Sequence, residues 1–186
     1  MISPTEYDAR FDEKLAIIRS VEEPLEQVTV SDICKRVGIS RNRFYRLFST
    51  KEEMFHWLIG YCFAISLDEV GKSLTWQEGI EKYLTTVNED RSFILNASLG
   101  LIEKPKLLRL PFETSRAGTI VKTLTEYKRR EITPALQLEI QTYVVAEENL
   151  ARQWLAPNDF TDMTKYVQAW ADCVPRNLYE ALELKR

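Results

Sequence analysis

The stretch that decides the fold is residues 29–55, which read TVSDICKRVGISRNRFYRLFSTKEEMF. It predicts two short helices separated by a turn at residues 38–40. Thr29 begins the first helix, because its hydroxyl can accept a backbone hydrogen bond and Asp32 completes a capping box. Gly38 ends that helix, since glycine tolerates left-handed backbone angles. Ser40 caps the second helix, Arg41–Phe48, and the pattern is that of a helix-turn-helix.

Apolar residues predict how the two helices pack and which side faces out. A small shared core can form from Ile33, Val37, Ile39, Phe44 and Phe48 with Phe11, Leu15 and Ile18 of a preceding helix. The side chains left outward on the second helix are Arg41, Asn42, Arg43, Tyr45 and Arg46.

Charge is concentrated in the same stretch. The whole chain has a net charge of −3, so it is not a general polycation. The segment from Ile33 to Lys51 nevertheless holds Lys35, Arg36, Arg41, Arg43, Arg46 and Lys51, and no Asp or Glu. One short cationic patch on an acidic chain is a focused site for a polyanion.

These residue types suit double-stranded DNA. The major groove admits one helix, where Arg can bond guanine and Asn can bond adenine with two hydrogen bonds each. The helix begins with Arg41, Asn42 and Arg43, which we expect to read base edges. Tyr45 and Arg46 are better placed for the sugar-phosphate backbone. Phosphate contacts are also expected from Thr29, at a helix N-terminus, and from Lys51.

Residues 29–55 closely resemble the N-terminal signature of the tetracycline-repressor (TetR) family of bacterial transcription regulators. The similarity lies in the Thr-Val opening, the glycine turn before Ser40, the aromatic ending of the second helix and the Lys51-Glu52-Glu53 start of the next. It implies an all-α homodimer, in which each subunit has a three-helix DNA-binding head and a roughly six-helix body. It also implies a near-palindromic operator and release from DNA when a small molecule binds the body.

The sequence departs from the family pattern at particular residues. Leu47 stands where the family prefers Tyr or His, so that phosphate contact is not transferred. Asn42 and Arg43 are bulkier than the usual residues, so the target sequence cannot be borrowed from relatives. The segment 20–28 also lacks the usual glycine.

The pattern of the rest of the chain predicts further helices and indicates no β-strand. Predicted helices are Thr5–Val21, 49–70 with a Ser49/Glu52 capping box, Trp76–Glu89 with a Thr75/Glu78 box, 91–102, 111–131, 134–155, and 160–182 with a kink at Pro175. We therefore predict an all-α fold, with a DNA-binding domain at residues 1–50 and an effector-binding and dimerisation domain at residues 51–186.

Apolar stripes in the last two predicted helices fit either the core of a monomer or a dimer interface. The resemblance favours a four-helix bundle between two copies. The interface residues predicted on this basis are Tyr143, Leu150, Trp154, Val167, Trp170 and Val174.

The body is rich in aromatic residues, which suit a small-molecule cavity as well as ordinary core packing. The residues predicted to line such a pocket are Trp57, Tyr61, Tyr83, Phe93, Asn96 and Tyr127.

Other classes of protein fit the sequence less well. An enzyme is disfavoured, because the chain has one His, no Gly-rich phosphate loop and no metal-ligand spacing. We expect no cofactor and no metal. Three scattered cysteines and the absence of a signal-like or membrane-spanning segment favour the cytoplasm. The sequence predicts a dimeric repressor released by a small molecule. A regulator controlled by a partner protein, and a helix-turn-helix used only for protein interaction, remain alternatives.

Overall fold

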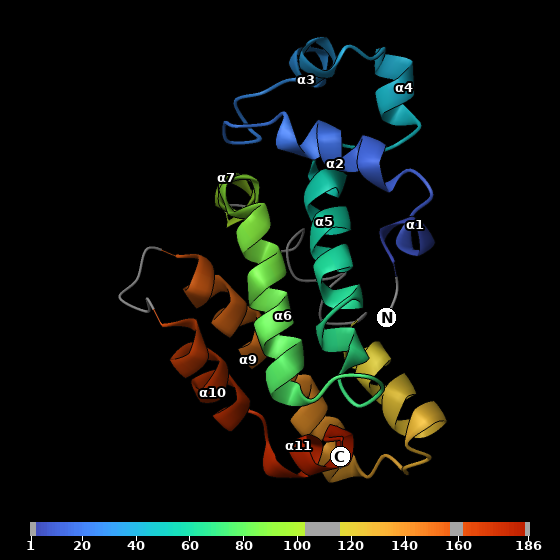
Figure 1. Cartoon of the computed structure of the whole chain (residues 1–186), viewed down its shortest axis with the longest axis vertical. Coiled ribbons are helices and arrows are strands. Elements are labelled where there is room, and N and C mark those ends of the chain that lie inside the picture. The colour runs from blue at the N-terminus through green and yellow to red at the C-terminus, as the bar shows by residue number, and fades with distance from the viewer. Residues whose placement is uncertain (1–2, 103–115, 157–161, 185–186) are drawn as a thin grey trace.

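The computed structural model describes residues 3–102, 116–156 and 162–184, and within these ranges every regular element is helical (Figure 1). The predicted all-α fold is confirmed. The elements are α1 (Pro4–Tyr7), α2 (Phe11–Arg19), α3 (Val30–Val37), α4 (Arg41–Tyr45), α5 (Glu52–Ala64), the 3₁₀ turn η1 (Leu67–Glu69), α6 (Trp76–Glu89), α7 (Arg91–Ile102), the π-helical turn η2 (Thr123–Tyr127), α9 (Pro134–Leu155), α10 (Met163–Asp172) and α11 (Arg176–Leu182).

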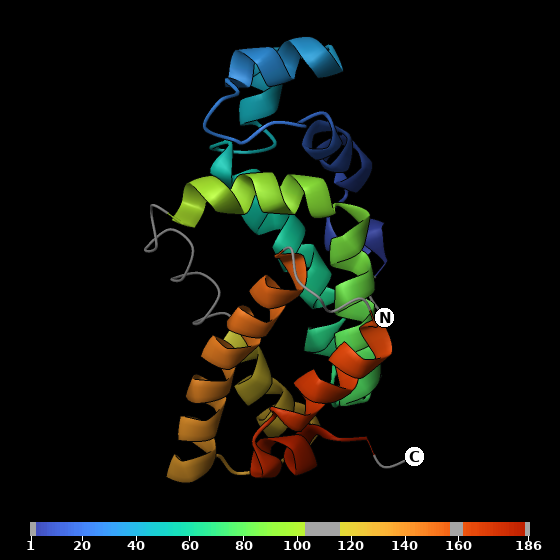
Figure 2. The ribbon, with the colours of Figure 1, turned by 90° about the vertical axis from the view of Figure 1, so that its left-hand side faces the viewer.

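The helices α2, α3 and α4 form one end of the molecule, here called the head, and the later helices form the body (Figure 1). Helix α7 lies across the molecule between the two (Figure 2). Helix α5 runs from the head into the body and contacts α2 as well as α6 and α7. Buried apolar side chains form one continuous cluster through both parts. The domain boundary at residue 50 therefore stays a prediction, because α5 serves both cores.

The N-terminal helix predicted over Thr5–Val21 is wrong in one respect, because the chain breaks between α1 and α2. The carboxylate of Asp8 competes with the helical backbone there. One of its oxygens accepts the backbone N–H of Arg10 at 2.8 Å. The other pairs with Lys14 Nζ at 2.7 Å and accepts the Trp57 indole N–H at 3.1 Å. Short acidic side chains that bond nearby N–H groups favour turns over helix interiors.

Helix α4 is shorter than predicted and ends at Tyr45 rather than Phe48. The backbone N–H of Leu47 bonds to the carbonyl of Phe44 at 2.8 Å, which tightens the chain into a turn. Leu47 and Phe48 are thereby buried. The start of α5 also differs from the predicted Ser49/Glu52 box. Glu53 donates its backbone N–H to Thr50 Oγ1 at 3.2 Å, and its carboxylate accepts the backbone N–H of Ser49.

Later helices follow the prediction more closely. Helices α6, α7 and α9 span the predicted ranges, and the Thr75/Glu78 capping box forms. The predicted 160–182 helix is broken rather than kinked, because α10 ends at Asp172 and Pro175 precedes α11. The helix predicted over 111–131 begins outside the described residues.

The body contains a buried ionic cluster. Arg116 donates from Nε and Nη2 to the two carboxylate oxygens of Glu147, at 2.9 and 3.2 Å, and from Nη1 to Asp68 at 2.9 Å. Arg116 and Glu147 are both buried. Burial raises the free energy of an isolated charge, so the pair depends on its mutual contact. The cluster joins η1, the helical segment at residue 116 and α9.

The predicted dimer interface is wrong for most of its residues. Tyr143, Trp154, Val167, Trp170 and Val174 are buried inside the protomer, and Leu150 is partly buried against the same core. Trp170 donates its indole N–H to the Tyr143 hydroxyl at 3.1 Å. Helix α10 packs against α6. The apolar stripe of the last predicted helix is therefore core, and it is covered by the same chain.

Candidate nucleic-acid interface

Local capping fixes the frame of α3 and α4. Thr29 Oγ1 accepts the backbone N–H of Asp32 at 3.2 Å, and Asp32 accepts the backbone N–H of Thr29 at 3.3 Å. Gly38 has the left-handed φ of 71° at the end of α3. Ser40 Oγ accepts the backbone N–H of Arg43 at 3.1 Å. The predicted helix-turn-helix frame is confirmed.

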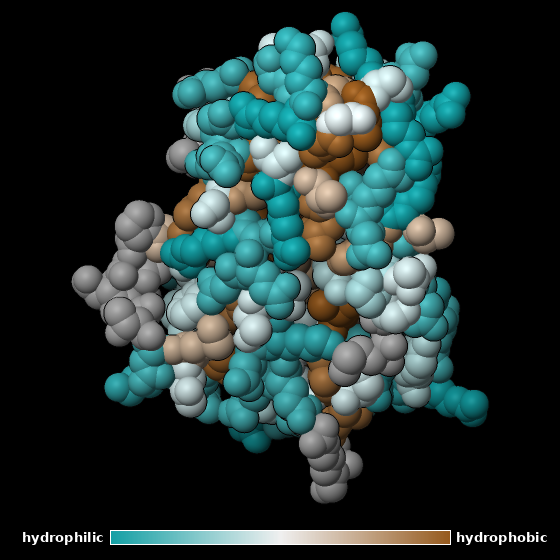
Figure 3. Space-filling model, turned by 45° about the horizontal axis from the view of Figure 1, so that its top comes forward, coloured by the Kyte–Doolittle hydropathy of each residue, from teal (hydrophilic) through white to brown (hydrophobic). Residues whose placement is uncertain are grey.

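Apolar contacts fix how α4 is rotated. Phe44 is fully buried, and its ring lies 5.9 Å from that of Phe48. Ile33 of α3 is also fully buried in the same cluster. Because one side of α4 is held in the core, the remaining side chains project from the end of the molecule. That end is covered mostly by hydrophilic side chains (Figure 3).

Three predicted DNA contacts project from this surface with their polar groups available. Arg41, Asn42 and Arg46 are exposed, and their side chains have no hydrogen bond or ion pair within the part of the chain that is described. Tyr45 is exposed as well, and its ring lies edge-on to that of Phe44. The arrangement offers guanidinium and amide donors on one short helix, as a major-groove reader requires.

Arg43 is also exposed, but it is already paired. Its Nε and Nη2 donate to the carboxylate of Glu13 on α2, at 2.6 and 2.5 Å. These hydrogen bonds lower the pKa of Glu13. The head contains a second pair, in which Arg36 binds Glu23 through Nη1 and Nη2, both at 2.6 Å. Sequence reasoning missed both acidic partners, which lie 30 and 13 residues away along the chain.

The two remaining predicted phosphate contacts are engaged within the protein. The Thr29 hydroxyl donates to Asp32 at 2.6 Å. Lys51 Nζ donates to the carbonyls of Leu25 and Val28, the latter at 3.1 Å. Two of the three ammonium N–H groups of Lys51 therefore hold the segment before α3, and one is left for another acceptor.

The residues predicted to line a ligand pocket are spread over separate places. Trp57 and Tyr61 pack against Tyr7 and Phe11, where α1 and α2 meet α5. Tyr83 and Phe93 are buried, and the Tyr83 ring contacts Phe63 and Trp170. Asn96 Nδ2 donates to the carbonyl of Glu22 at 2.6 Å.

Tyr127 is 63% exposed, and the Lys72 ammonium lies over its ring. Its place in a ligand pocket stays a prediction. None of the helices in the described ranges is long and apolar enough to cross a membrane.

Comparison with known proteins bears on the head. Residues 21–58 match the family model described as bacterial regulatory proteins, tetR family. The matched range covers α3, the turn, α4 and the first half of α5. No curated protein and no solved structure matches the chain. Residues 21–58 therefore carry the helix-turn-helix of the tetR family of bacterial regulatory proteins, and this head supports a DNA-binding regulator of transcription.

Proposed function

We propose that the protein binds a near-palindromic DNA operator as a homodimer, represses transcription there, and is released by an effector that acts on the body. The observation that carries the proposal is the exposed surface of α4 and the residue that follows it, where Arg41, Asn42 and Arg46 have free side chains among the described residues. The proposal assigns no catalytic step to the protein. Such a regulator would act in the bacterial cytoplasm, on the nucleoid.

Position along α4 suggests the role of each side chain. Arg41, Asn42 and Arg43 occupy the first turn, which approaches base edges in helix-turn-helix proteins. Tyr45 and Arg46 follow at the end of the helix, where the sugar-phosphate backbone is closer. The N-terminus of α3 at Thr29 carries partial positive charge, which favours a phosphate.

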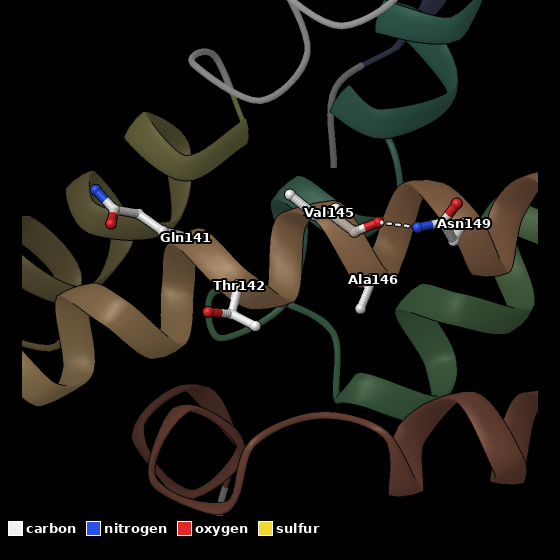
Figure 4. Close-up of a pocket in the computed structure, with 5 residues that line it drawn as sticks. All are labelled: Gln141, Thr142, Val145, Ala146 and Asn149. Atoms are coloured by element: carbon white, nitrogen blue, oxygen red, sulfur yellow. Dashed lines mark hydrogen bonds between the residues drawn. The ribbon is translucent and has the colours of Figure 1, made fainter.

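The outward side of α9 supports a homodimer. Leu138 and Val145 are large apolar residues that are 64% and 40% exposed, on a helix of 22 residues. Val145 also lines a shallow open groove on α9, together with Gln141, Thr142, Ala146 and Asn149 (Figure 4). Apposed α9 helices from two copies would remove this apolar surface from water. The double variant Leu138→Glu/Val145→Glu should therefore sediment as a monomer, and an unchanged dimer would place the interface elsewhere.

Contacts between head and body offer a route for control. Arg19 at the end of α2 binds Asp90, between α6 and α7, through Nε at 2.6 Å and Nη2 at 3.1 Å. Asn96 on α7 holds the carbonyl of Glu22. An effector that displaces α6 or α7 would shift the head through these contacts. A small molecule and a partner protein could both act this way, so protein-mediated control remains the second candidate.

The experiment that tests the function is selection of bound duplexes from a random DNA pool, repeated at rising salt. We expect enrichment of a near-palindromic sequence, with half-sites about one DNA turn apart and binding that weakens steeply with salt. Failure to enrich any sequence, or a flat salt response, would overturn the proposal. Repeating the selection with candidate metabolites, and separately with cell proteins retained by the immobilised dimer, distinguishes the two kinds of effector.

A further inference from the structure

The Arg43–Glu13 pair leaves a specific part of the guanidinium free. Arginine has five N–H donors in one plane. Glu13 takes one from Nε and one from Nη2. The edge formed by Nη1 and the second Nη2 hydrogen has no acceptor within the described part of the chain. That edge has the spacing to bind two acceptors at once, as on guanine O6 and N7.

The other arginine–glutamate pair of the head is built differently. Arg36 binds Glu23 through Nη1 and Nη2, which is the edge that Arg43 keeps free. Nη1 of Arg36 also donates to the carbonyl of Ser20 at 3.2 Å. Arg36 therefore ties α3 to the segment after α2 through its terminal Nη1/Nη2 edge, and that edge is not left for another acceptor pair. The terminal edge of Arg36 is thus engaged in holding the head together. Arg43 is held by Glu13, and its terminal edge can still donate to DNA.

On the basis of the proposed function, we propose that Glu13 is a positioning residue that fixes the Arg43 guanidinium for a two-hydrogen-bond contact with one base. A long exposed side chain loses conformational freedom when it is ordered on DNA, and prior ordering reduces that loss. Glu13 belongs to α2, and α2 is anchored by the buried Ile17 and Ile18. The carboxylate is therefore held by a different element from the one that carries Arg43.

The charge of Glu13 should act on specificity in a second way. At longer range the carboxylate cancels much of the positive charge of Arg43, so this arginine adds little to sequence-independent attraction by phosphates. Its short-range hydrogen bonds to a base remain. Both effects raise the ratio of specific to non-specific affinity. If Glu13 instead only competed with DNA for Arg43, its removal would raise specific affinity and that ratio together.

The test compares two variants with the same change of charge, Glu13→Gln and Glu23→Gln. For each, Kd is measured at one salt concentration on the duplex selected by the wild type and on a scrambled duplex of equal length. We expect Glu13→Gln to lower the specificity ratio about tenfold and to relax the preference at one base pair, since a two-hydrogen-bond contact carries discrimination of that order. Glu23→Gln should lower both Kd values, because removal of a negative charge strengthens binding to either duplex, and it should leave their ratio within about twofold.

A double variant shows whether Glu13 acts through Arg43. In the Arg43→Ala background, Glu13→Gln should cause no further fall in the ratio. An unchanged or raised ratio for Glu13→Gln alone overturns the positioning role. If the wild type selects no sequence, the proposed function itself fails. If the wild type selects an operator and Glu13→Gln binds it with the same specificity ratio, only the positioning role fails. Melting curves of each variant verify that the head remains folded.

Discussion

The head and the body each contain an arginine bound to a glutamate through the same atoms. Arg43 in the head and Arg116 in the body both present Nε and Nη2 to a carboxylate. The surroundings differ, because the side chains of Arg43 and Glu13 are 43% and 30% exposed, while those of Arg116 and Glu147 are 5% and 1% exposed. The third nitrogen, Nη1, binds Asp68 in the body and has no acceptor among the described residues in the head.

This difference separates a contact that supports the fold from one that supports binding. Charges in the interior have lost their water, so the removal of one partner leaves the other without compensation. Charges at the surface stay solvated, and their pairing contributes little to stability. We infer that Arg116 matters mainly for the free energy of unfolding and Arg43 mainly for DNA.

The largest expected effect follows from breaking the buried pair. Arg116→Met leaves the Glu147 carboxylate buried without its cation, and we expect a loss of about 3–5 kcal/mol in the free energy of unfolding. For a chain of this size each kcal/mol lowers Tm by about 2–4 °C. Urea and thermal denaturation measure the change, and Arg43→Ala should leave Tm almost unaltered.

A second substitution checks the cause. Arg116→Met/Glu147→Leu removes both buried charges, and Asp68 is exposed enough to remain hydrated. We expect this double variant to regain most of the lost stability, because apolar replacements of a buried pair are often neutral. A double variant as unstable as the single one would instead assign the loss to packing of the arginine stem.

Two glycines, one in the head and one in the body, should give changes in stability of intermediate size. Gly38 in the head has a φ of 71° and open space where a Cβ would lie. Gly38→Ala should therefore cost only the backbone strain, about 1–2 kcal/mol. Gly71 in the body has a φ of 83°, and its Cβ would lie 3.0 Å from both Cδ2 and the carbonyl of Leu182. Gly71→Ala should lower Tm more than Gly38→Ala, and equal shifts would show that the contact relaxes freely.

Sequence predicted the parts of the site that depend on neighbouring residues. The caps at Thr29 and Ser40 and the left-handed glycine at Gly38 need only three or four adjacent positions, and the structure has all of them. The break near Asp8 was missed, because it depends on Lys14 and Trp57 converging on one carboxylate. Local signals could not show that a side chain 49 residues away completes the turn.

Sequence also could not show what covers an apolar stripe. The spacing of Val167 and Trp170 correctly indicated one buried face of a helix, and Val174, which lies beyond the end of α10, is buried as well. The face is covered by the same chain, whereas the dimer prediction required a second copy. Periodicity reports that a face is apolar and carries no information on its partner. For the same reason the Glu13–Arg43 contact was invisible, since helix position indicates only that both residues face outward.

The smallest expected effect concerns the exposed Arg36–Glu23 pair and its dependence on pH. Hydrogen bonds from Arg36 lower the pKa of Glu23 from 4.5 to about 2. A lowered pKa in the folded state means that the pair stabilises the protein above pH 4.5 and loses that contribution as pH falls towards 2. The Tm difference between wild type and Glu23→Gln should therefore be small at neutral pH and shrink steadily below pH 4.5. A difference that stays constant over this range would mean that ionisation of Glu23 does not contribute, and that its hydrogen bonds to Arg36 act without charge.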